Sequence, residues 1–324
     1  MWCPSPARAG WAIRGEPPTT DGRIALKNLQ AQIASLEVRA ARGGLSAVSR
    51  AGLIELIALR GQVLGLIADY ERAEALAERW ALDERTDSLA FLARARMRAT
   101  FHRFTDALAD LARAEALGLG REVLDHERAG ILQAVGRSDE ATELLQEALA
   151  RRTSFETLGA LAGLYAERGE LARAEHLFTE SRECYRRVSP FPLALLDVRR
   201  GQMWLEHGDL RRARAWFDAA CCRVPCLAPA QGHLAEVEAA MGEPEVAIAR
   251  LRPLAISSDD PAYAGQLARI LGEIGRVAEA RRWRSLAAAR YEELAARYPA
   301  AFAEHAAEFW LAVGDDPSRA LDLG

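Results

Sequence analysis

Two His-x-x-Glu pairs are the residues of this sequence whose types and spacing come closest to metal chemistry. They are His233 with Glu236 and His305 with Glu308. Residues three apart share one helix face, and imidazole with carboxylate binds metals inside some helical bundles. However, Arg269 stands between the two pairs, and solvated polar residues are the commoner case. We therefore predict no metal site and no cofactor, and keep a metal-binding helical protein as the weakest alternative.

The cysteines form the second candidate group, because three of them lie in the run CCRVPC. Cys222 and Cys226 are four residues apart, but Pro225 interrupts a helix there. Zinc prefers four Cys or His ligands in paired spacings, and a second pair is not evident. We interpret Cys221, Cys222 and Cys226 as packing residues, with a metal or redox role as the alternative. The odd total of five cysteines predicts a reducing, cytoplasmic location.

No catalytic motif stands out in the sequence. Phosphate-binding Gly-rich loops, GxSxG elbows and HExxH runs are all missing. We therefore predict that the protein is not an enzyme and assign no catalytic residue.

Composition narrows the class of partner. The 324 residues are rich in Ala, Leu, Arg and Glu, which favour helices, and carry a net charge of −4. Nucleic-acid-binding domains usually have a basic excess, so the balance predicts no nucleic acid partner. No apolar run free of charge is long enough to span a bilayer, which predicts no membrane association.

An internal repeat organises most of the chain. Its clearest marker is an alanine early in every second helix, and successive alanines are 33 or 34 residues apart except for two steps of 39 and 40. These alanines are Ala73, Ala107, Ala141, Ala174, Ala213, Ala247, Ala280 and Ala320. Small residues such as Gly61, Ala95 and Gly201 lie about twelve residues earlier, where two helices could cross closely. Glycines at 136, 169, 208, 242, 275 and 314 predict left-handed helix stops.

This pattern resembles the tetratricopeptide repeat family. The best match is GQMWLEHGDLRRARAWFDAACCRVP, residues 201–225, and the resemblance covers roughly residues 51–324. It departs from the family at Ala68 and His102, where a turn glycine is expected, at Ser138, where an aromatic residue is usual, and at Arg284. The resemblance implies an all-α solenoid of about eight antiparallel helix pairs in a right-handed superhelix.

The ends of the chain predict two further segments. Residues 1–22 contain four prolines and read as a disordered tail, and residues 23–50 read as an amphipathic capping helix and a linker. A partner-binding role for that helix is the alternative. Residues 51–324 form the solenoid, whose last pair is short. Its open end could support self-association.

The repeat register also predicts which residues face the concave groove. The first helix of each pair lines that groove in the family, so polar residues on its inner face are the candidate contacts. They are Glu55, Gln62, Arg96, His126, Gln133, Arg199, Gln202, His233, Glu236, Gln266, Arg269, His305 and Glu308. The groove is mixed in charge and lacks the Lys and Asn of a carboxylate clamp.

These features predict a scaffold or adaptor that binds a protein or peptide in its groove. A regulatory or assembly subunit of an enzyme complex, joined through the open end, is the main alternative.

Overall fold

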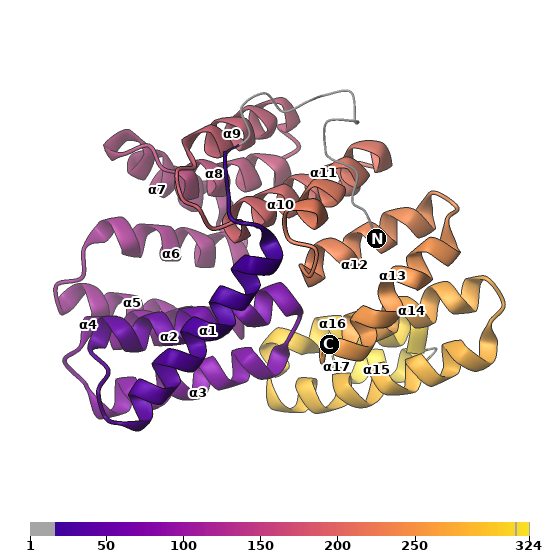
Figure 1. Ribbon diagram of the computed structural model, residues 1–324, viewed down its shortest axis with the longest axis horizontal. Helices are drawn as coiled ribbons and strands as arrows, with labels where there is room; N and C mark the ends of the chain where they lie inside the picture. The colour runs from indigo at the N-terminus through magenta and orange to yellow at the C-terminus, as the bar shows by residue number, and fades with distance from the viewer. Residues whose placement is uncertain (1–16, 315, 324) are drawn as a thin grey trace.

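The computed structural model describes residues 17–314 and 316–323, and within these ranges every regular element is a helix (Figure 1). The tail expected over residues 1–22 falls largely on residues 1–16, outside the described part. The first helix is α1, Gly22–Ala41. Pairs then follow: α2 (Ala47–Leu64) with α3 (Ile67–Asp83), α4 (Ser88–Thr100) with α5 (Phe104–Ala116), α6 (Arg121–Ala134) with α7 (Ser138–Arg151), α8 (Phe155–Glu167) with α9 (Leu171–Cys184), α10 (Phe191–Glu206) with α11 (Leu210–Arg223), α12 (Ala228–Ala240) with α13 (Pro244–Ser257), α14 (Pro261–Glu273) with α15 (Val277–Arg297), and α16 (Pro299–Phe309) with α17 (Pro317–Leu323).

The repeat alanines hold the helices of each pair together. All eight of them are buried, as are the apolar residues four positions later, such as Leu111 and Phe178. One close approach is at Gly201 of α10, where an added Cβ would lie 2.6 Å from a ring carbon of Phe217 on α11. The predicted all-α solenoid of helix pairs is therefore confirmed.

The turns inside the pairs follow the predicted glycines with three exceptions. Five of them have a positive φ, from 75° at Gly169 to 82° at Gly242. In the first pair this conformation falls on Gly65 (φ 66°), not at Ala68, which lies inside α3. His102 takes it in the second pair, at φ 55°.

Gly314 does not form the left-handed helix stop that was predicted for it. It ends a π-helical segment, η2 (Trp310–Gly314), and its backbone is not left-handed. A Cβ there would lie 2.3 Å from the Trp310 ring, so close packing is the reason for this glycine.

Helix α1 runs across the solenoid (Figure 1). Its leading end lies against the end of α11, where a Cβ on Gly22 would be 2.3 Å from the Arg223 carbonyl oxygen. Its trailing end is tied to α3 by the ion pair between Glu37 and Arg72, at 2.6 Å. Leu29 and Ile33 of α1 are buried in one apolar core with residues of α2.

The superhelix closes on itself, because the first two pairs contact the last three (Figure 1). Both carboxylate oxygens of Asp259, which precedes α14, accept hydrogen bonds from α3: from Ile67 N–H at 2.6 Å and from Ala68 N–H at 2.9 Å. Tyr298 stacks on Phe101 with ring centroids 4.1 Å apart. We call the contacts that Asp259 and Tyr298 make with α3 and Phe101 the ring closure.

The C-terminal pair ends with exposed apolar side chains. Leu311 is 63% exposed and Leu321 is 82% exposed. Self-association through this end stays a prediction. Among the described residues, no helix is long and apolar enough to span a membrane.

Candidate binding site

A cavity of about 490 Å³ lies on the inner side of the ring, and we call it the inner cavity. It is built by α2, α6, α8, α10 and the start of α12, so helices from five different pairs contribute to it. Its lining is mainly apolar, with a few polar groups. The residues are Leu59, Gln62, His126, Phe155, Glu156, Gly159, Ser189, Phe191, Pro192, Leu195, Leu196, Val198, Arg199, Gln202 and Pro229.

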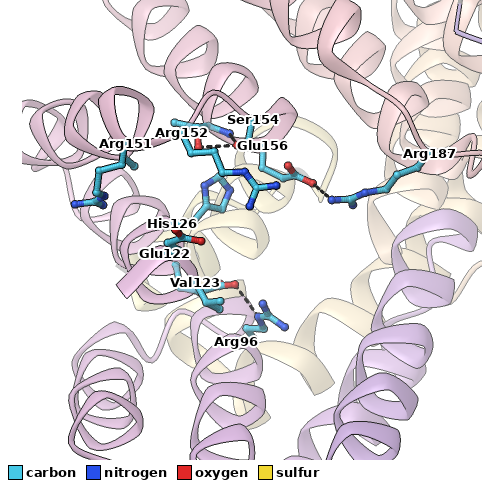
Figure 2. Close-up of a pocket in the computed structure, with 12 residues that line it drawn as sticks. Arg96, Glu122, Val123, His126, Arg151, Arg152, Ser154, Glu156 and Arg187 are labelled. Carbon is cyan, nitrogen blue, oxygen red and sulfur yellow. Dashed lines mark hydrogen bonds and ion pairs between the residues drawn. The ribbon is translucent and has the colours of Figure 1, made fainter. Parts of the chain in front are cut away.

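A second pocket of about 300 Å³, the arginine pocket, adjoins the inner cavity and shares His126 and Glu156 with it (Figure 2). Figure 2 shows His126, Arg152 and Glu156 near its centre, while Arg151 points away. The lining residues are Arg96, Glu122, Val123, His126, Glu127, Ala148, Arg151, Arg152, Ser154, Glu156, Thr157 and Arg187.

Three of these arginines are already paired. Arg96 bonds Glu127 at 2.7 Å and also pairs with Glu55. Arg187 bonds Glu156 at 2.7 Å. Burial lowers the pKa of Arg96, but the carboxylates of Glu127 and Glu55 outweigh this effect and raise that pKa overall. Arg151 pairs with the buried Asp125.

Arg199 is different, because within residues 17–314 and 316–323 its side chain has no hydrogen bond or ion pair. Its side chain is exposed, yet it stands inside the concave surface, and the surrounding protein lowers its pKa by desolvation. An arginine stays charged through such a shift. The inner cavity therefore holds one cation whose charge is not matched by a bonded carboxylate.

The predicted groove residues divide into two groups. The structure brings Gln62, His126, Arg199 and Gln202 into the inner cavity and Arg96 into the arginine pocket. Side-chain hydrogen bonds connect two more predicted residues to the first group, because Gln202 bonds His233 at 2.9 Å and His233 contacts Glu236 at 3.4 Å.

The other predicted residues lie outside both cavities. Gln133 bonds Glu167, Arg269 bonds Glu273 at 2.6 Å, and Gln266 bonds the Gly232 carbonyl at 3.1 Å. His305 and Glu308 are exposed and 3.9 Å apart. Glu55 reaches the site only through its pair with Arg96.

Sequence reasoning missed Arg151, Arg152 and Arg187. They lie at the end of α7 and in the segment before α10, whereas the predicted groove residues all come from the first helix of each pair. Two signals could have found them: the doubled arginine that ends the third repeat, and the 39-residue step that contains Arg187.

The other chemical candidates lie apart from the cavities. Burial raises the pKa of the Cys221 thiol to about 12 and that of Cys226 as well, so neither is an activated nucleophile. In the described ranges, no three His, Cys, Asp or Glu side chains converge as a metal site would require.

His126 makes a pH dependence testable. Burial, aided by Arg199 and Arg96, lowers its pKa in the folded protein. The unfolded chain therefore binds a proton more readily, and stability falls as pH drops below about 6.5, the ordinary value for histidine. We expect wild type to lose more stability than His126→Gln between about pH 7.5 and pH 5.5, in urea titrations. The matched control is His176→Gln, an exposed imidazole on α9. Parallel pH profiles for wild type and His126→Gln would contradict the prediction.

Comparison with known proteins supports the fold. No protein-family model and no curated sequence matches the chain. Among solved structures, the Cut9–Hcn1 hetero-tetramer of the APC/C matches with a TM-score of 0.54 and 14% identity over 92% of this chain, which spans 52% of that chain. Human IFIT1 matches with a TM-score of 0.59 and 14% identity, covering 89% of this chain and 74% of that one. The type IV pilus biogenesis factor PilW matches at 0.50 and 17% identity, with coverages of 65% and 94%. The chain therefore has the solenoid fold of tetratricopeptide repeat proteins.

The predicted exclusion of nucleic acid is wrong. Human IFIT1, which has this fold, is seen with PPP-AAAA, an RNA. The physical reason is that a net charge of −4 averages over the whole surface, whereas a pocket can gather cations locally. The arginine pocket gathers four arginines in this way, and three glutamates line it as well.

Proposed function

We propose that this protein is a binding scaffold that holds a peptide segment of a partner protein in the inner cavity, and that it is not an enzyme. The observation that supports this most directly is the cavity itself, a concave site with apolar walls and a few polar groups. Such a lining is typical of ligand sites, in which apolar contacts provide affinity and polar groups fix orientation. The cytoplasmic location is part of the proposal.

The shape of the inner cavity favours a segment over a large flat surface. A volume of about 490 Å³ has room for a few side chains, not for a folded domain. The five contributing helix pairs are fixed relative to one another by the ring closure, so the cavity is preformed. Preformed sites lose less entropy on binding.

Filling the cavity tests the proposal. Gln202→Trp places an indole in the lining, and Arg211→Trp places the same group on the exposed outer surface of α11. In quantitative affinity capture from a lysate of the source cells, we expect Gln202→Trp to capture at least about 90% less of the partner protein than wild type does. A tenfold loss of affinity corresponds to about 1.4 kcal/mol of binding free energy. Arg211→Trp should retain them. Equal capture by both variants, with unchanged circular dichroism, would refute the proposal.

A further inference from the structure

Arg199 and the walls around it indicate what kind of segment the inner cavity takes. Glu156, the carboxylate that lines the same cavity, is engaged by Arg187 at 2.7 Å. Glu167 acts on Arg199 only through space, so no carboxylate is bonded to the Arg199 guanidinium. A guanidinium can donate two parallel hydrogen bonds to one carboxylate. An anionic group entering the cavity would therefore meet a guanidinium that is free to bind it.

Apolar side chains surround this cation. Phe155, Phe191, Leu195 and Val198 line the same cavity. Phe191 and Val198 are already buried, so a ligand removes apolar surface from water mainly at the half-buried Phe155 and Leu195. An Arg–carboxylate pair formed beside such a wall is less screened than one on open surface. The lining therefore matches a segment with one charge and several apolar groups.

The neighbouring charges argue against a ligand with many negative charges. Glu122, Glu127 and Glu156 line the adjoining arginine pocket. Three of the four arginines there already bond carboxylates of the protein, so a polyanion that engages more than Arg152 in this pocket would have to displace them. A single carboxylate at Arg199 requires no such exchange.

We propose that the inner cavity recognises a peptide segment in which one Asp or Glu is flanked by apolar residues, with the carboxylate bound by Arg199 and the flanks against Phe155, Phe191 and Leu195. This specificity rests on the proposed function. Arg152 lines the arginine pocket but not the inner cavity, so this specificity does not need it.

The test uses fluorescein-labelled peptides and the full-length protein in fluorescence polarisation. Each peptide has two apolar residues on either side of a central position that is Glu, Gln, Lys or phosphoserine. We expect wild type to bind the Glu peptides at least about tenfold more tightly than the Gln peptides. Arg199→Gln should abolish that preference and Arg199→Lys should keep part of it. The matched control Arg211→Gln, on the outer surface of α11, should not change it.

The remaining outcomes are distinguishable. Equal binding of Glu and Gln peptides that is still lost in Gln202→Trp would overturn the carboxylate inference and leave the proposed function standing. Tighter binding of phosphoserine peptides, or of 5′-triphosphorylated oligoadenylate, would overturn it in favour of a polyanion. No binding of any peptide, together with partner capture that Gln202→Trp does not affect, would refute both proposals.

Discussion

Phe217→Ala is expected to lower the free energy of unfolding by about 3–5 kcal/mol, the range for deleting a buried aromatic side chain. Phe217 is 0% exposed. Its ring fills the crossing of α10 and α11 at Gly201, and it stacks on the imidazole of His233 with centroids 5.2 Å apart. Gly201, which faces the ring, has no side chain that could turn into the space left by the substitution. Most of the cavity left by the substitution should therefore persist.

Urea unfolding followed by circular dichroism measures this effect. Ile256→Ala is the control, because Ile256 is 70% exposed and its truncation should change stability by less than about 0.5 kcal/mol. A loss below about 1 kcal/mol for Phe217→Ala would show that the pair can repack. Since His233 also bonds Gln202 of the inner cavity, the variant should weaken peptide binding as well.

Asp259→Ala is expected to lower the free energy of unfolding by about 2 kcal/mol, because each hydrogen bond to a charged group contributes more than a neutral one. Helix α3 has no side-chain cap of its own, since Leu66 stands at the N-cap position. Asp259 takes that role from 192 residues away in sequence, accepting from Ile67 N–H. Its carboxylate also suits the positive end of the helix dipole.

Two measurements check this prediction. Urea unfolding gives the stability. In Asp259→Ala, hydrogen exchange at the amides of Ile67 and Ala68 should accelerate relative to wild type by more than exchange at amides within α8. Asp139→Ala is the matched control: this side chain is 93% exposed and pairs with Arg168, so its loss should cost under about 1 kcal/mol. Unchanged exchange at Ile67 and Ala68 in Asp259→Ala would mean that α3 does not depend on this cap.

The sequence is sufficient to predict the helix pairs, because their markers are local. An alanine such as Ala213 and its partner Phe217 are four residues apart, and the matching Gly201 is only twelve residues away. Turn residues follow the repeat pattern less closely. His102 replaces a glycine in the left-handed region, and Trp283, buried at 8% exposure, takes the inward place beside Arg284.

The ring closure and the cavity depend on longer distances. Whether repeat one meets repeat seven follows from small rotations that accumulate at every interface. The bond between Asp259 and Ile67 leaves no periodic signal in the sequence. The candidate site could therefore be predicted only in part: inner-helix residues such as His126 and Arg199 followed from the register, whereas Arg152 and Arg187 come from a helix end and a loop.

The ring closure has a mechanical consequence. Superhelices built from stacked repeats act as springs, since a small change at each interface alters the pitch. Here Asp259 binds the start of α3, and Tyr298 adds a second contact by stacking on Phe101. The structure should therefore resist tension applied to its two ends until the ring closure breaks, and elastic extension of the superhelix would begin only after that.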